Sequence, residues 1–328
     1  SVDPVRRLVY LPTSSPSPDF YGGERPGDNR DANSVVALHA TNGDVAWHFQ
    51  LVHHDVWDYD TPAQPSLVTL ERDGRPVDAL VQVTKQGFVF VFDRATGAPL
   101  FDVEERPVPQ GGVAGEMLSR TQPYPVAPPP IAPQHLAAAD AWGITPWDRN
   151  ACRRQIEALR NEGLYTPPSE QGTLLVPFTG GGANWGGAAF DPASGTLFIN
   201  TSRAAHSITL IPTEDFAAAS AAEPDVEISP QRGTPWAMRR DVLLSPLGLP
   251  CNPPPWGMLT AIDLNQGTIR WESVLGTVRD LAPVPLPIGW GTPNFGGPMA
   301  TAGGLVFIGA AMDDYLRAFD AATGAELW

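Results

Sequence analysis

The chain has 328 residues, a formal net charge of −15 and only 17% charged residues, together with 32 glycines and 36 prolines. The acidic charge argues against a nucleic-acid partner, because phosphate binding needs a basic surface. No apolar run approaches the roughly 18 residues of a membrane helix. The Gly and Pro content favours strands, turns and long loops over helices.

One pattern recurs four times along the chain: a short apolar strand, a turn ending in glycine, and a strand that closes on an aromatic residue four positions later. The glycine–aromatic pairs are Gly43–Trp47, Gly97–Phe101, Gly267–Trp271 and Gly324–Trp328. Glycine suits the positive-φ position of a hairpin, and the flanking runs alternate like half-buried strands. The repeat predicts blades of a β-propeller, each with four antiparallel strands, with the aromatic packed between neighbouring blades. Four unrelated hairpins are the alternative.

Further strands are expected within these blades, at residues 65–70, 79–84, 188–191, 196–200 and 305–309. The first blade is expected to lack its inner strand. We therefore predict an all-β protein, with residues 1–328 forming one partial propeller domain of about four blades. An open propeller exposes strand edges. Either the chain is a fragment that lacks its natural N-terminus, or something else, such as a second copy, completes the ring.

A long insertion, roughly residues 102–183, separates the second and third repeats and carries one short helix. Asp148 can cap the start of this helix and Gly163 can end it. One face of the helix is apolar and consists of Cys152, Ile156 and Leu159. Cys152 is therefore expected to point inward.

The run from His53 to Asp60 crowds three carboxylates and two imidazoles at a strand-to-loop junction. A metal site is one interpretation. Adjacent residues on a strand face opposite ways, however, so His53 and His54 do not easily share one metal. A structural role is the favoured interpretation for either histidine alone.

Two other features are unusual. Lys85 is the only lysine in the chain and ends an apolar strand, which indicates a need for a compact ammonium group; chance in an arginine-biased composition is the alternative. The glycine-rich run 180–187 surrounds Asn184 and Trp185. Its glycines allow the backbone to approach something flat and buried, and a structural bend is the alternative.

Taken in order, these motifs resemble the quinoprotein dehydrogenases, which use pyrroloquinoline quinone (PQQ), and most closely their glucose/quinate-type branch. The resemblance covers nearly the whole chain. Its matching segments are 54–60, Lys85 at twenty-seven residues after Asp58, 182–186, 166–173 and 244–251.

The resemblance implies an eight-bladed propeller, of which this chain supplies about half, with PQQ near the axis beside a Ca²⁺ ion. By motif position, Asp58 would take the hydroxyl proton of the substrate and contact the metal. Lys85 would hydrogen-bond the quinone oxygens, and Asn184 and Trp185 would contact the cofactor. Relatives often carry a metal-binding Asn where this chain has Ser15, whose hydroxyl is a poorer Ca²⁺ ligand.

The resemblance further implies a periplasmic enzyme that oxidises a sugar, a polyol or another alcohol and passes electrons to a quinone or cytochrome acceptor. It also implies a disulfide between Cys152 and Cys251, with two separate buried thiols as the alternative. The competing function is a non-catalytic β-propeller scaffold or binding protein. Such a scaffold needs neither the carboxylate cluster nor the lysine.

Overall fold

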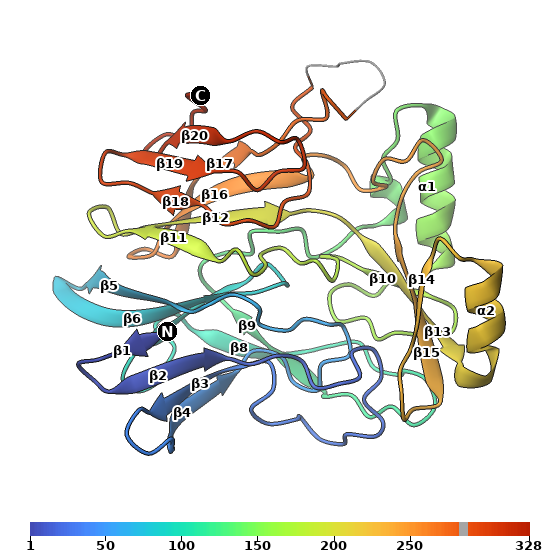
Figure 1. The fold of residues 1–328 in the computed structure, drawn as a ribbon, viewed down its shortest axis with the longest axis horizontal. Coiled ribbons are helices and arrows are strands. Elements are labelled where there is room, and N and C mark those ends of the chain that lie inside the picture. The colour runs from blue at the N-terminus through green and yellow to red at the C-terminus, as the bar shows by residue number, and fades with distance from the viewer. Residues whose placement is uncertain (282–287) are drawn as a thin grey trace.

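The computed structural model describes residues 1–281 and 288–328 and consists mainly of strands and loops. Figure 1 shows four antiparallel sheets that follow one another like blades. The first contains β1 (Val2–Asp3), β2 (Leu8–Pro12), β3 (Ser34–His39) and β4 (Val45–Gln50). The second contains β5 (Ser66–Arg72), β6 (Arg75–Val83) and β7 (Val89–Asp93). The third contains β11 (Ala188–Asp191), β12 (Thr196–Ser202), β16 (Gly257–Asp263) and β17 (Thr268–Val274). The fourth contains β18 (Met299–Ala300), β19 (Leu305–Ile308) and β20 (Arg317–Asp320).

The strands predicted for the later blades are present, within a few residues of the expected bounds. The expectation for the first blade was wrong. Val2 and Asp3 pair with Val9 and Leu8, so β1 supplies a short fourth strand. The four strands of this sheet lie side by side in sequence order, β1-β2-β3-β4.

The recurring aromatics pack between neighbouring sheets, as the repeat predicted. A β-carbon on the turn glycine of the second sheet, Gly97, would lie 2.5 Å from the Trp47 ring of the first. Phe101 lies in the same way against Gly267, and Trp271 against Gly324. The indole N–H of Trp47 also donates to the carbonyl of Arg94 at 3.2 Å. The turn glycines thus provide both a positive φ and the space for an aromatic ring.

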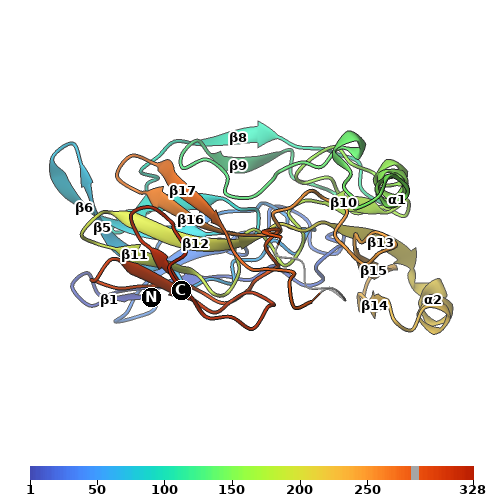
Figure 2. The ribbon, with the colours of Figure 1, turned by 90° about the horizontal axis from the view of Figure 1, so that it is seen from above.

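Two excursions leave the blades. The first runs from the second sheet to the third and contains β8 (Val103–Pro107), β9 (Thr121–Pro125), η1 (Ala138–Asp140), α1 (Pro146–Ala158) and β10 (Thr173–Leu175). Its place agrees with the predicted insertion at roughly 102–183. Figure 2 shows the β8–β9 hairpin and α1 on one side of the blades.

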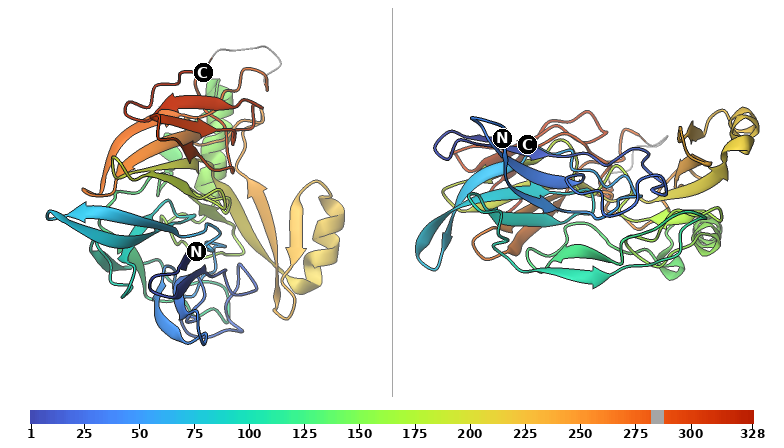
Figure 3. Two further views of the ribbon diagram at one scale, coloured as in Figure 1. Left: turned by 60° about the vertical axis from the view of Figure 1, so that its left-hand side comes forward. Right: turned by 90° about the horizontal axis from the view of Figure 1, so that it is seen from below.

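The second excursion, between β12 and β16, was not predicted. It contains β13 (His206–Pro212), η2 (Thr213–Asp215), α2 (Phe216–Ala222), β14 (Glu227–Pro230) and β15 (Trp236–Val242). These strands join β10 from the first excursion in a separate sheet of order β10-β13-β15-β14. Figure 3 shows this sheet and α2 projecting beside the blades. Among the described residues, no helix combines the length and hydropathy needed to span a bilayer.

Helix α1 forms where it was predicted, but with different ends. Its N-cap is Thr145, whose side chain accepts the N–H of Asp148 at 3.1 Å. Pro146 follows at a position where a missing N–H costs nothing. The helix ends at Ala158, so the expected cap at Asp148 and end at Gly163 were wrong. The prediction that Cys152 points inward is confirmed, because the residue is fully buried.

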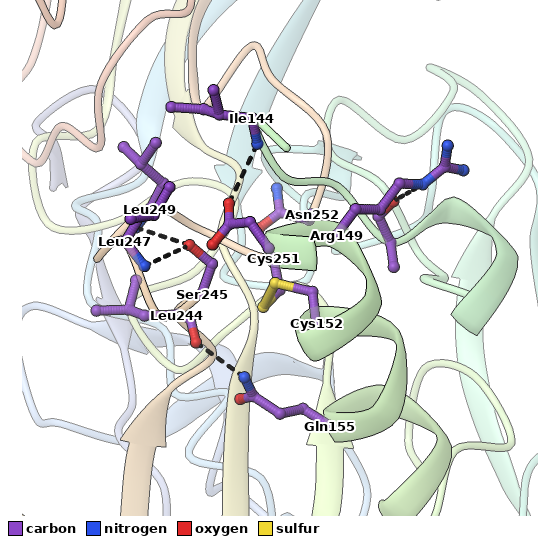
Figure 4. The surroundings of a disulfide bond; sticks show 12 residues. Ile144, Arg149, Cys152, Gln155, Leu244, Ser245, Leu247, Leu249, Cys251 and Asn252 are labelled. Atoms are coloured by element: carbon purple, nitrogen blue, oxygen red, sulfur yellow. Dashed lines mark hydrogen bonds between the residues drawn. A yellow bond between two sulfur atoms is a disulfide. The ribbon is translucent and has the colours of Figure 1, made fainter. Parts of the chain in front are cut away.

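Cys152 and Cys251, which are 99 positions apart in sequence, form a disulfide with their Cα atoms 5.2 Å apart. Figure 4 shows the bond joining α1 to the segment that returns from β15. Beside it, the side-chain amide of Gln155 donates to the carbonyl of Leu244 at 3.1 Å. The bond therefore fastens the two excursions to each other.

Candidate active site

The candidate site lies where the loop after β4 meets the turn after β6. Lys85 Nζ donates to the carboxylate of Asp58 at 3.1 Å and to its backbone carbonyl at 2.9 Å. The same amine lies 2.5 Å from a carboxylate oxygen of Asp60. The structure thus brings together the predicted base and the predicted quinone partner, twenty-seven residues apart in sequence.

Lys85 is buried, and its position is set by a tight turn. The turn closes through the N–H of Gly87, which donates to the carbonyl of Thr84 at 3.0 Å. Burial opposes a charged amine, but the carboxylates of Asp58 and Asp60 outweigh it and raise the pKa of Lys85. The side chain is therefore a fixed cation at neutral pH.

Asp58 is mostly buried, and burial is the main reason why its pKa rises to about 7. Lys85 acts in the opposite direction, and the carboxylates of Asp55 and Asp60 raise the pKa further. The second carboxylate oxygen of Asp58 lies 3.6 Å from a guanidinium nitrogen of Arg240, which is too far for a direct hydrogen bond. A carboxylate with one oxygen held and the other free, with a pKa near neutrality, can accept a proton from a bound substrate.

The backbone of Asp58 adopts a left-handed conformation, with φ of +57°. Non-glycine residues in this region cost on the order of 1–3 kcal/mol. His54, four residues earlier, is also left-handed, with φ of +45°. The loop therefore holds two unfavourable backbone conformations, and the surrounding contacts must stabilise them.

The glycine-rich run 180–187 lies against the Lys85 turn. The N–H of Gly182 donates to the carbonyl of Lys85 at 2.5 Å, and Ala183 donates to Thr84 at 3.2 Å. A β-carbon at Gly181 would lie 2.7 Å from the Cα of Lys85. The glycines thus allow a close backbone approach, although the partner observed here is the Lys85 turn.

The side chains of Asn184 and Trp185, which the sequence singled out in this run, lie in different environments. The amide of Asn184 is engaged within its own loop: it donates to the carbonyl of Gly180 at 2.6 Å and accepts the N–H of Trp185 at 2.7 Å. Trp185 is 63% exposed. It lines an open groove of about 460 Å³ whose other walls are Ser1, Val2, Gln64–Leu67 and Gly186–Ala188.

Ser15 lies next to the site-bearing loop. Its hydroxyl donates to the carboxylate of Asp55 and accepts from the amide of Asn33 at 3.1 Å. Among the described residues, no group of three or more His, Cys, Asp or Glu side chains is arranged to hold a metal ion. Ser15 and Asp58 therefore do not by themselves furnish a complete ligand set.

The neighbouring histidines have separate structural contacts. His54 is buried, and its ring nitrogens lie 2.8 Å from the carboxylate of Glu116 and 2.6 Å from the carbonyl of Gly27. His53 instead contacts Gln50 and Glu105. The two rings have no shared partner, in agreement with the structural interpretation.

Two charged residues of the site were not singled out from the sequence. Asp60 was visible only as part of a carboxylate-rich run. Arg240 comes from β15, in the excursion that was not predicted, and Glu227 binds its guanidinium at 2.9 and 2.8 Å. Its remaining terminal nitrogen donates to Thr179 at 3.0 Å and faces Asp58. No local signal marks Arg240, because it lies 155 positions after Lys85.

Comparison with known families gives a match over residues 1–328 to the PQQ family model, described as the β-propeller domain of glucose/ethanol/alcohol dehydrogenases. The chain belongs to this family.

Curated relatives of the PQQ family are similar over the whole chain. A probable quinate dehydrogenase (quinone) from Xanthomonas campestris pv. juglandis is 43% identical over 100% of this chain and 43% of its own length. The quinoprotein glucose dehydrogenase of Escherichia coli is 40% identical over 98% of this chain and 42% of its own length. The chain thus spans less than half the length of the curated relatives it matches.

Solved structures of two other dehydrogenases share the fold. A europium-containing methanol dehydrogenase superposes with a TM-score of 0.61 at 23% identity, over 100% of this chain and 45% of that protein. A quinohemoprotein alcohol dehydrogenase from Comamonas testosteroni superposes with a TM-score of 0.60 at 22% identity, over 99% of this chain and 39% of that protein. These matches support the β-propeller architecture alone.

Proposed function

We propose that the protein containing this chain is a PQQ-dependent dehydrogenase that oxidises a sugar, a polyol or another alcohol. The observation that carries the proposal is the buried contact between Asp58 and Lys85, within a chain of the PQQ family. Relatives named for quinate, glucose and glycerol support this range of substrates. All of these molecules present hydroxyl groups to the enzyme.

In this proposal Asp58 is the general base. Its free carboxylate oxygen accepts the proton of the substrate hydroxyl, and its other oxygen stays on Lys85. Lys85, held as a cation by Asp58 and Asp60, directs an ammonium group toward developing negative charge. Arg240 adds a second cation, beside the other carboxylate oxygen of Asp58. These residues position groups and stabilise charge.

The charge of the site suits PQQ. PQQ is an anionic, flat molecule, and two cations converge near Asp58. The groove beside Trp185, which Asp58 and Lys85 do not line, offers an exposed aromatic side chain to a planar ring. When bound, PQQ supplies the oxidising chemistry by accepting two electrons and the substrate's hydrogen. Lys85, Asn184 and Trp185 are the residues proposed to contact it.

Calcium is the proposed metal, with Asp58 and Ser15 as candidate ligands. Ca²⁺ takes six to eight oxygen ligands, and among the described residues no three His, Cys, Asp or Glu side chains are grouped to hold a metal ion. The proposal therefore requires further oxygens from the cofactor and from other parts of the protein. We assign no step of the reaction to the metal.

The four blades are proposed to form half of an eight-bladed ring. The glycine–aromatic packing that joins neighbouring sheets is open at both ends of the series. Among the described residues, no atom outside the two chain neighbours of Gly43 lies within 4 Å of a β-carbon placed there, and Trp328 is 72% exposed. Relatives more than twice as long support completion by a longer chain. Self-association of two copies is the alternative, and a monomer in solution would count against it.

A periplasmic location and a quinone or cytochrome acceptor complete the proposal. The disulfide between Cys152 and Cys251 supports an oxidising compartment. The word "quinone" in the names of two relatives supports a quinone acceptor. A non-catalytic scaffold is less well supported, because a scaffold has no need of a buried lysine between two carboxylates.

The test is dye reduction by the longer protein, loaded with PQQ and Ca²⁺ and supplied with quinate, glucose or glycerol. Asp58→Asn should lower kcat by at least about 100-fold, the usual contribution of a general base. Asp44→Asn, which changes an exposed turn carboxylate in the β3–β4 hairpin, is the matched control and should leave kcat unchanged. Equal turnover of Asp58→Asn and the wild type would show that the base is wrongly assigned. Failure to bind PQQ, measured by absorbance, would favour the scaffold.

A further inference from the structure

The loop that carries Asp58 is organised around another carboxylate, that of Asp55. One oxygen of Asp55 accepts the N–H of Trp57 at 2.9 Å, and the other accepts the N–H of Tyr59 at 2.9 Å. Trp57 and Tyr59 are the residues on either side of Asp58. A single carboxylate thus fixes the peptide that follows the proposed base and the Val56–Trp57 peptide ahead of it.

Asp55 is itself held from outside the loop. The side-chain amide of Asn33 donates to its carboxylate at 2.8 Å and to the carbonyl of Tyr59 at 3.0 Å. Arg25 donates to its backbone carbonyl at 2.5 Å, and Ser15 donates to its carboxylate. Asp55 and Asn33 are each only 1% exposed. The loop is therefore tied to residues of the segment between β2 and β3 of the first sheet.

These contacts account for the backbone conformation of Asp58. Left-handed φ values at non-glycine residues persist only where the surroundings over-determine them. Here four donors converge on one buried carboxylate, and two of them are the backbone amides of the residues on either side of Asp58. Lys85 contacts both the carbonyl and the side chain of Asp58. A small rotation of the loop would therefore separate the base from the amine.

We propose that Asp55, with Asn33 as its main outside support, is a positioning residue that holds Asp58 in its working orientation against Lys85. This inference deepens the proposed function and rests on it. Asp55 itself touches neither substrate nor cofactor. Ser15, considered above as a metal ligand, takes part in the same network.

An ordinary role in folding is the competing explanation, because turn carboxylates commonly accept nearby backbone amides. The chain contains a control of that kind. Asp320 accepts the N–H groups of Ala322 and Thr323 in the turn after β20, at 3.1 and 2.8 Å. It has the same local function as Asp55 but lies in the fourth sheet, away from Asp58. Comparing the two positions separates positioning from turn formation.

The experiment is a double-mutant cycle in the longer, PQQ-loaded protein. Asp55→Asn and Asn33→Ala are each made in the wild type and in Asp58→Asn, and kcat and KM are measured separately. A loop displaced by about 1 Å should lower kcat by about 100-fold in the wild type, with KM changed by less than about threefold. In the Asp58→Asn background, either change should slow the residual turnover by less than about threefold, because the residue it positions is already gone. Asp320→Asn should be neutral in both backgrounds.

A second readout does not depend on turnover. Hydrogen exchange of the Trp57 and Tyr59 amides, measured on the longer protein without cofactor, should be at least about tenfold faster in Asn33→Ala. If Asp55→Asn slows Asp58→Asn as much as it slows the wild type, Asp55 does not act through Asp58 and the inference is wrong. Unchanged exchange in Asn33→Ala would also overturn it. A wild-type protein without activity but with the expected exchange would refute the proposed function and leave the loop architecture supported.

Discussion

The ionisation of Asp58 links the site to folding stability. Burial raises its pKa to about 7 in the folded chain, against about 3.9 in an unfolded one. The folded state therefore binds this proton more tightly, and its stabilising effect is full below about pH 4 and lost as the pH rises through about 7. Relative to the wild type, Asp58→Asn should therefore gain free energy of unfolding between pH 5 and pH 8, by at most about 3 kcal/mol.

The measurement is urea unfolding of wild type and Asp58→Asn at both pH values, in the presence of a chelator. The pH-dependent part isolates the ionisation of Asp58, because the raised pKa already includes the attraction of the charged form to Lys85. Asp320→Asn, an exposed carboxylate whose pKa is lowered mainly by the Thr323 hydroxyl and backbone amide, should not show this gain at pH 8. An Asp58→Asn variant that gains nothing at pH 8 would contradict a raised pKa.

Lys85 neutralises two carboxylates in a mostly buried position. Lys85→Met should lower the free energy of unfolding at pH 8 by about 3–5 kcal/mol, because it leaves Asp58 and Asp60 without their partner. Arg153→Met is the control: it removes an ion pair with Glu157 on α1, in which both side chains are exposed, and should cost no more than about 1 kcal/mol. Equal losses at the two positions would mean that the Lys85 contacts are no stronger than a surface ion pair.

At the scale of elements, the disulfide has the largest expected effect. It closes a loop of about 100 residues between α1 and the return from β15. Replacing both Cys152 and Cys251 with Ala should lower the free energy of unfolding by about 2–5 kcal/mol. Reductant should destabilise the wild type and leave the variant unchanged. If the wild type reacts with an alkylating agent as two free thiols under native conditions, the pairing is wrong.

The sequence could predict those elements whose signals are local. Helix α1 was found from its apolar face, but its start was misplaced because Thr145 and Asp148 are both good capping residues and only the backbone geometry distinguishes them. The sheet of β10, β13, β15 and β14 was missed for a different reason. Its strands come from two excursions, and β15 carries adjacent arginines in place of clear alternation. Arg240, and with it part of the site, was missed together with that sheet.

At the scale of the whole molecule, the repeat was the most informative feature of the sequence. From the second blade on, the turn glycine of each blade packs against the recurring aromatic residue of the blade before it. One sequence pattern therefore encodes both a hairpin and the contact between neighbouring sheets. The Asp58–Lys85 contact joins the loop after the first sheet to the second sheet. Its distance depends on how neighbouring blades dock, which no local pattern specifies. The resemblance to the quinoprotein dehydrogenases could therefore indicate Asp58 and Lys85 as a pair, whereas only the packed blades define the distance between them.

Blade docking gives a test of the half-ring proposal. Gly43 and Gly97 have similar φ values of +79° and +73°, so replacing either with Ala imposes a similar backbone cost of roughly 1–2 kcal/mol. Only Gly97 is covered by an aromatic ring, that of Trp47. In this chain, Gly97→Ala should therefore destabilise by an additional 1–3 kcal/mol or so from overpacking, as measured by thermal or urea unfolding. In the longer protein, Gly43 should lie under the aromatic of a preceding blade, and Gly43→Ala should become as costly as Gly97→Ala. If Gly43→Ala remains the milder change there, no blade docks on the first sheet in this way, and the ring is not completed as proposed.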